Sequence, residues 1–372
     1  MKIELLEKIP VANTFVGEEE AQAVYEVVKS GWLSMGARVK AFEESFARTV
    51  DAPYAVSLNS GTAALHVVLA ALGIGEGDEV IVPSLTFIST ANVVLYQNAV
   101  PVLAECDPKT YNITPEAIRA KITKKTKAII SVDMNGMPVD YDALREFEAQ
   151  GIPVIADSAE SLGAQYRGKK IGSIFRIHCF SFFPNKNITT GEGGMIVTTD
   201  KVLAESCARI RHQGQERRYH HTDLGYNYRM TEMQAALGLV QLEKFPKALQ
   251  EKTRLARRYD ELLRAIPAIS RPVVPAYVTQ HAWYMYAVSC RSKQERDRIV
   301  SELEKSNIET RLSFPPVHIQ PYYQKRFGFT DASLPVTYDA WSRLIDIPIW
   351  AGLGDERQDR VVRALQEITA KF

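Results

Sequence analysis

Short apolar runs alternate with amphipathic segments along most of this chain. The runs typical of buried strands occupy residues 79–83, 101–105, 128–132, 154–156, 178–182 and 195–199. Segments with a helical period occupy residues 20–30, 62–72 and 141–149, and Thr114-Pro115 opens a further helix. This order predicts an α/β fold with a mostly parallel central sheet, because parallel strands need helical crossovers that cover both faces.

The pattern changes after a helix predicted over residues 231–242. Charged amphipathic helices are then predicted at residues 252–266, 292–306 and 355–369, with a strand at residues 283–290. A chain of 372 residues suits one large domain and one smaller domain. We therefore predict a large α/β domain over residues 1–248 and a smaller C-terminal α+β domain over residues 249–372.

Composition is that of an ordinary globular protein, with 46% apolar residues and a formal net charge of +1. A charge this close to zero gives no electrostatic case for binding nucleic acid or an anionic membrane. The first residues mix charges and lack an apolar signal core, so we expect a cytoplasmic protein. The scattered cysteines predict free thiols in a reducing compartment; they are Cys106, Cys179, Cys207 and Cys290.

Lys186 lies between an aromatic, apolar strand and a glycine-rich turn, in the run from Phe180 to Gly194. We expect desolvation there to lower the pKa of its ammonium and to free the amine as a nucleophile. A neutral lysine amine condenses with an aldehyde to a Schiff base, the resting form of enzymes that use pyridoxal 5'-phosphate (PLP). Taken alone, a single lysine is more simply a solvated surface charge.

Asp157 closes the predicted strand that contains residues 154–156. Ligands of open parallel sheets bind at the carboxyl ends of strands, where a carboxylate can keep a pyridine nitrogen protonated. The alternative is a strand-end aspartate that caps the next turn. The gap between Asp157 and Lys186 leaves room for a turn and a further strand, so both side chains can reach one ring.

Three further segments lie where a PLP site needs them. Gly61 and Thr62 follow a turn and open an apolar helix, whose N-terminus attracts an anion such as a phosphate; simple N-capping is the alternative. Phe87 follows a strand end and can stack on a ring, or fill the core instead. The polar, aromatic loop 225–230 suits an anion, a subunit interface or a plain hairpin.

Metal chemistry has no support in the sequence. His220 and His221 are adjacent rather than spaced as ligands, and neither an H-E-x-x-H motif nor a cysteine pair accompanies them. We predict no metal site.

Together these segments resemble the DegT/DnrJ/EryC1/StrS family of PLP-dependent nucleotide-sugar aminotransferases, over residues 11–370. The segments that carry the resemblance are residues 57–69, 77–92, 157–172, 180–194, 225–242 and 314–323. The resemblance implies the aspartate-aminotransferase fold (PLP fold type I) and a homodimer with shared active sites.

The resemblance also implies roles for individual residues. Lys186 matches the Schiff-base lysine, Asp157 the partner of the pyridine nitrogen, and Glu160 the group beside the ring hydroxyl. Phe87 matches the stacking aromatic. The residues that match the phosphate site are Gly61, Thr62 and Ser181, with Asn227 reaching in from the other subunit. The residues that match substrate-side positions are Arg229 and His318, and we add Tyr323 as a further candidate.

The substrate is the finer question. Residues 308–318 look most like GDP-perosamine synthases, which implies transfer from glutamate to C4 of GDP-4-keto-6-deoxymannose, in O-antigen or other polysaccharide biosynthesis. A dTDP- or UDP-keto-sugar, or amination at C3, is an alternative. A PLP-dependent sugar dehydratase and a non-catalytic PLP-binding regulator are others, although Lys186 argues against those dehydratases of the family that carry histidine there. Asp133, Glu160 and Ile349-Trp350 depart from many relatives, and we expect those differences to touch sugar recognition.

Overall fold

The computed structural model describes residues 7–371. Within them, one seven-stranded sheet has the strand order β1-β9-β8-β5-β4-β2-β3. Its strands are β1 (Tyr54–Leu58), β2 (Glu79–Pro83), β3 (Val100–Ala104), β4 (Thr126–Val132), β5 (Val154–Asp157), β8 (Ile177–Ser181) and β9 (Gly194–Thr198). Only β9 runs against its neighbours in this sheet. The prediction of a mostly parallel α/β sheet is confirmed.

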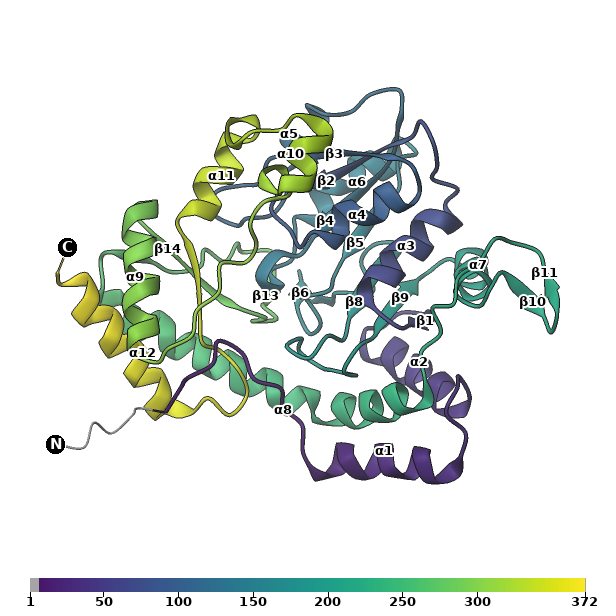
Figure 1. Ribbon diagram of the computed structural model, residues 1–372, viewed down its shortest axis with the longest axis horizontal. Helices are drawn as coiled ribbons and strands as arrows, with labels where there is room; N and C mark the ends of the chain where they lie inside the picture. The colour runs from purple at the N-terminus through teal and green to yellow at the C-terminus, as the bar shows by residue number, and fades with distance from the viewer. Residues whose placement is uncertain (1–6, 372) are drawn as a thin grey trace.

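Helices cover both faces of this sheet (Figure 1). On one face, α3 (Gly61–Ala71), α4 (Ser89–Tyr96) and α7 (Lys201–Arg211) pack against strand residues such as Val82 and Ile155. On the other face, α2 (Ala37–Thr49) and α6 (Tyr141–Ala149) pack against the alternate strand residues, including Ile81 and Ala156. Side chains of neighbouring strand residues point to opposite faces, so near-continuous apolar strands serve both layers.

A second, smaller layer lies beside the large sheet. Its antiparallel sheet joins β12 (Ile269–Ser270), β14 (Tyr286–Cys290) and β15 (Leu344–Ile347), and α9 (Lys293–Lys305) and α12 (Gly354–Thr369) pack on it. The remaining strands are β6 (Gln165–Tyr166), β7 (Lys169–Lys170), β10 (Gln215–Arg217), β11 (His220–His221) and β13 (Val278–Gln280). The remaining helices are α1 (Glu18–Ser30), α5 (Pro115–Arg119), α10 (Pro321–Phe327), α11 (Pro335–Ser342) and the 3-10 turns η1 (Met134–Gly136), η2 (Leu263–Ala265), η3 (Val317–Ile319) and η4 (Asp331–Ser333).

One long helix, α8 (Glu232–Leu262), connects the two layers (Figure 1). The sequence predicted two helices here, so that prediction is wrong. Pro246 lies inside the helix, where it removes a hydrogen bond at a cost of roughly 3 kcal/mol. Burial on both sides offsets this cost: Phe245 packs in the core of the large sheet, and Leu255 and Tyr259 pack in the core of the small sheet. The predicted domain boundary at residue 248 falls within this helix and stays a prediction.

No helix within residues 7–371 is both long and apolar enough to cross a membrane. All four cysteines are buried and unpaired, as predicted.

The start of α2 depends on a side chain from α8. The N-cap of α2 is Gly36, which offers no side chain, and the Glu232 carboxylate accepts hydrogen bonds from the amides of Arg38 and Val39 at 3.0 and 2.8 Å instead.

We expect Glu232→Ala to lower the free energy of unfolding by roughly 2 kcal/mol, because two amides of a helix N-terminus lose a charged acceptor. Denaturant unfolding measures the loss. The exposed Glu243→Ala on the same helix is the matched control and should change little; equal effects would contradict the capping role.

Candidate active site

The site is built on loops that leave one edge of the large sheet. Parallel strands place their carboxyl ends together, and β2, β4, β5 and β8 end there. The loops that follow contribute Phe87, the 133–136 turn, Asp157 with Glu160, and Ser181 with Lys186. The structure therefore brings together side chains that lie far apart in the sequence.

Lys186 is held between an acid and an aromatic ring. Its ammonium lies 3.2 Å from Glu160 Oε1 and 4.0 Å from the centroid of the Tyr284 ring, and its side chain is 12% exposed. Burial lowers the pKa of Lys186, but the Tyr284 phenol and the Glu160 carboxylate raise it, and the net shift is upward. The expected lowering by desolvation is thus wrong for this structure, because these partners stabilise the ammonium.

Tyr284 was not anticipated from the sequence. It precedes β14 and is 2% exposed, and its hydroxyl donates to Asn185 Oδ1 at 3.2 Å, next to Lys186. Glu160 is fixed from the opposite side, where the Asn135 amide donates to its Oε2 at 2.8 Å. The lysine is thus positioned by residues of the large sheet and by a residue that leads into the small one. An aromatic residue beside a strand carries no motif that could have revealed this role.

Asp157 is buried at the end of β5, with 6% of its surface exposed. Its Oδ2 accepts the Thr90 hydroxyl at 2.9 Å, and its Oδ1 accepts the Ala159 amide at 3.2 Å. Burial raises the pKa of Asp157 to about 6, and these hydrogen bonds hold the rise back. The carboxylate is therefore preorganised, and it gains from a protonated ring nitrogen as a further partner.

The start of α3 has the features of a phosphate cradle. Ser60 caps this helix by accepting the Ala63 amide, and the other first-turn amides have no intrahelical acceptor. A Cβ on Gly61 would lie 2.8 Å from the Cβ of Ser181, so only glycine allows the two loops to meet this closely. Thr62 lines an adjacent cavity of about 260 Å³ together with Asn59. The predicted phosphate residues of this chain, Gly61, Thr62 and Ser181, therefore lie together.

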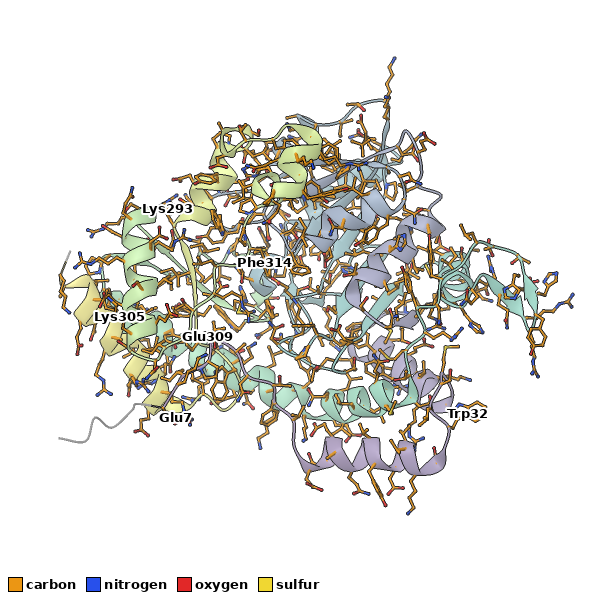
Figure 2. The ribbon with its side chains drawn as sticks, viewed as in Figure 1. Glu7, Trp32, Lys293, Lys305, Glu309 and Phe314 are labelled. Carbon is orange, nitrogen blue, oxygen red and sulfur yellow. The ribbon has the colours of Figure 1, made fainter. Side chains whose placement is uncertain are left out.

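Phe87 presents an exposed aromatic face at the end of β2. Its surface is 54% exposed, and its ring packs edge-on against Phe314 at 5.5 Å between centroids. Phe314 lies near the middle of the molecule, between the segments of the small layer and the large sheet (Figure 2). An apolar ring left open just before Thr90, the hydrogen-bond partner of Asp157, suits stacking on a flat cofactor. With the phosphate cradle and Asp157, these residues fit PLP.

Asn227 and Arg229 lie in the loop before α8. Asn227 is exposed, and Arg229 directs its guanidinium to His212 Nδ1 of the same chain at 2.5 Å. No contact within residues 7–371 joins either side chain to Lys186 or Asp157. Their assignment to the phosphate of a second subunit and to the substrate stays a prediction.

His318 and Tyr323 are buried rather than open to a cleft. His318 Nδ1 pairs with the Ser84 hydroxyl at 2.8 Å, and the Tyr323 hydroxyl donates to Asn92 Oδ1 at 2.9 Å. The relative exposures of the two residues are 0% and 1%. Both therefore anchor the 317–327 segment to the large domain in this structure, and their roles toward a substrate stay predictions.

The residues that depart from many relatives divide into two groups. Asp133 is 1% exposed, and it accepts the Tyr141, Ser161 and Ser158 hydroxyls. These hydroxyls satisfy the Asp133 carboxylate within the fold, and its expected part in sugar recognition stays a prediction. Ile349 and Trp350 instead line a cavity of about 30 Å³ together with Lys186.

Comparisons with known proteins give matches over nearly the whole chain. The sequence model of the DegT/DnrJ/EryC1/StrS aminotransferase family matches residues 15–366. GDP-perosamine synthase of Caulobacter vibrioides is 40% identical over 98% of this chain and 99% of its own length. The spore coat polysaccharide biosynthesis protein SpsC of Bacillus subtilis is 37% identical over 97% of both chains.

Solved structures give the same picture. DesV of S. venezuelae, solved in complex with a ketimine intermediate, superposes with a TM-score of 0.90 at 34% identity, over 94% of both chains. NtdA of Bacillus subtilis, solved with bound cofactor PMP, has a TM-score of 0.90 at 26% identity, over 100% of this chain and 87% of that chain. The predicted fold class, sugar aminotransferase activity and PLP cofactor are confirmed by these matches.

Thr90 offers a test of the carboxylate at Asp157. We expect Thr90→Val to raise the pKa of Asp157 further, by about 0.5–1 unit, because the carboxylate loses a hydrogen bond that stabilises its charged form. PLP binding needs the ionised Asp157 carboxylate, so PLP affinity should fall as the pH drops through the pKa of Asp157. Because this pKa is higher in the variant, its PLP affinity should begin to fall at a higher pH than that of the wild type. PLP affinity measured against pH gives the answer. Thr90→Ser keeps the hydroxyl and should behave as the wild type; a valine profile that matches it would refute the role of Thr90.

Proposed function

Because the chain belongs to the DegT/DnrJ/EryC1/StrS aminotransferase family, we propose that it moves an amino group from glutamate to a nucleotide-linked 4-keto-6-deoxy sugar. The observation that carries this proposal is the placement of Lys186 between Glu160 and Tyr284, on the same sheet edge as the buried Asp157. GDP-4-keto-6-deoxymannose is the first candidate acceptor, since GDP-perosamine synthases match the chain from end to end.

Each charged or aromatic residue of the site has a separate role in the proposed reaction. PLP, when bound, supplies an electron sink that makes protons on the adjacent carbon labile. Asp157 would hold a proton at the ring nitrogen of bound PLP, and Phe87 would stack on the ring. Lys186 would hold the cofactor in the resting enzyme, and its free amine would take up and return the proton at the amino carbon of the substrate. Glu160, beside Lys186, lies where it can bond the ring hydroxyl and restrain the freed ammonium.

A homodimer with shared sites is part of the proposal. Asn227 is exposed at the end of the loop that enters α8, and the β10–β11 hairpin projects away from the rest of the molecule (Figure 1). Trp32 is 64% exposed between α1 and α2 and points outward (Figure 2). Exposed aromatic residues of this size are typical of protein interfaces. A mass measurement in solution tests the dimer.

The biological setting follows from the same observations. Four buried thiols without disulfides support a reducing, cytoplasmic location. A role in polysaccharide biosynthesis has support from the relative SpsC. SpsC also keeps a second candidate open, an aminotransferase that acts at C3 or C4 of a different nucleotide-linked keto-sugar.

Lys186 is the residue whose loss should abolish the reaction. We expect the purified, PLP-loaded protein to be yellow, and borohydride to fix the cofactor covalently on the peptide that contains Lys186. Lys186→Ala should lose several orders of magnitude in turnover while still binding PLP through the cradle, Phe87 and Asp157. Mass spectrometry of the reduced peptides locates the label. A label on another lysine would overturn the assignment.

The substrate prediction concerns specificity. Incubation with 15N-glutamate and a 4-keto-6-deoxy nucleotide sugar should release 2-oxoglutarate. The 15N label should appear in the 4-amino nucleotide sugar that forms. Simple keto acids should be poor acceptors, because they lack the binding energy of the nucleotide. Product masses from a panel of GDP-, dTDP- and UDP-linked keto-sugars rank the acceptors. If ordinary keto acids turn over as fast as every nucleotide sugar tried, the nucleotide-sugar proposal falls.

A further inference from the structure

A second lysine, Lys252, lines the same small cavity as Lys186. It comes from α8 and is 8% exposed. Its ammonium donates to Asn187 Oδ1 at 2.9 Å and approaches the Tyr284 carbonyl at 3.4 Å. Within residues 7–371 it has no ion-pair partner, which is unusual because a buried lysine is normally paired with a carboxylate.

The hydrogen bonds of Lys252 converge on the loop that carries Lys186. Asn187 accepts from Lys252 and donates its amide to the carbonyls of Leu162 and Ala282, at 3.0 and 2.9 Å. Lys252 thereby ties together the turn after Glu160, the Lys186 loop and the segment before β14. A donor at this place fixes the direction from which Lys186 enters the site.

Lys252 is also an electrostatic neighbour of Lys186. Both line the cavity of about 30 Å³, and the other residues that line it are not titratable. Burial and the charge of Lys186 lower the pKa of Lys252 to about 7. The other titratable groups that face the pair are Glu160 and Tyr284, beside Lys186, and His281, whose pKa is lowered to about 3 by burial and by the charge of Lys252. Lys186 therefore has the Glu160 carboxylate beside it, whereas Lys252 has no ion-pair partner within residues 7–371.

We propose that Lys252 is a positioning residue for Lys186: it holds the Lys186 loop through Asn187, and it takes over the positive charge of the pocket when Lys186 binds the cofactor. This inference rests on the proposed role of Lys186. Condensation of the Lys186 ammonium with the cofactor aldehyde forms an uncharged carbon–nitrogen double bond and releases one water and one proton. The neutral amine of Lys252 accepts that proton.

The direction of the effect follows from mutual repulsion. A charge on Lys252 disfavours a proton on the lysine–cofactor linkage, so the linkage keeps its uncharged form to a lower pH than it otherwise would. Replacing Lys252 by a neutral residue removes this repulsion and raises the pH at which the linkage takes up its proton. We expect a shift of about one pH unit for a like charge that lines the same small cavity.

The test is a pH titration of the visible spectrum of the PLP-loaded full chain. Lys252→Gln keeps a donor for Asn187 but loses the charge, and its midpoint should rise by about one unit. Lys252→Arg keeps the charge and should have a midpoint at or below that of the wild type. Lys247→Gln, on the exposed side of α8, is the matched control and should leave the midpoint unchanged.

Each outcome decides the proposal. A loaded Lys252→Gln protein with the wild-type midpoint overturns it, and so does a Lys252→Arg protein with a midpoint above the wild type. If Lys252→Gln fails to fold, the midpoint of Lys252→Arg decides the proposal: a midpoint at or below the wild type supports it, and one above the wild type overturns it. Borohydride labelling of the same samples distinguishes failure of the Lys186 proposal from failure of the Lys252 proposal. Absence of label on Lys186 refutes the role of Lys186. If Lys186 is labelled but the spectral midpoint of Lys252→Gln does not move, only the role of Lys252 is refuted.

Discussion

The active site depends on a buried carboxylate, that of Asp133, whose hydrogen bonds all lie within the fold. Asp133 Oδ2 accepts the hydroxyls of Tyr141, Ser161 and Ser158, and its Oδ1 accepts the Val139 amide. Its own amide donates to the Asp157 carbonyl at 3.2 Å. The turn that carries both Asp157 and Glu160 is therefore tied to the end of β4. Burial raises the pKa of Asp133 to about 6, so these hydrogen bonds must offset a real desolvation cost.

Three buried charged groups, Glu160, Asp157 and Lys252, lie on the elements around Lys186. Glu160 is in direct contact with the ammonium, Asp157 is buried at the end of β5, and Lys252 donates to Asn187, the residue after Lys186. Each of these groups is buried, so their interactions are screened little by salt. The same low dielectric explains why Lys186 does not behave as an isolated desolvated amine: the acid and the phenol beside it outweigh the cost of burial.

Local pattern was enough to predict the scaffold. The predicted strand at residues 79–83 and helix at residues 141–149 match β2 and α6 to the residue, because apolar periodicity and turn residues mark both ends. The continuity of α8 was missed, since Pro246 is a strong local signal for a helix end and only tertiary packing overrides it. The elements that support the cofactor loops were therefore accessible from sequence, whereas the element that joins the two layers was not.

The predicted site shows the same division. Lys186, Asp157, Glu160, Gly61 and Ser181 stand in motifs, and the fold brings them to one edge. Tyr284 and Lys252 lie outside the segments that carry the resemblance, and Thr90 lies in one without a role assigned to it. The roles of all three come from side chains that meet only after the chain has folded. Tyr284 contacts Lys186, Thr90 donates to Asp157, and Lys252 donates to Asn187, the residue that follows Lys186. The motifs thus identify the reacting groups, while their protonation is set by neighbours that only the tertiary structure supplies.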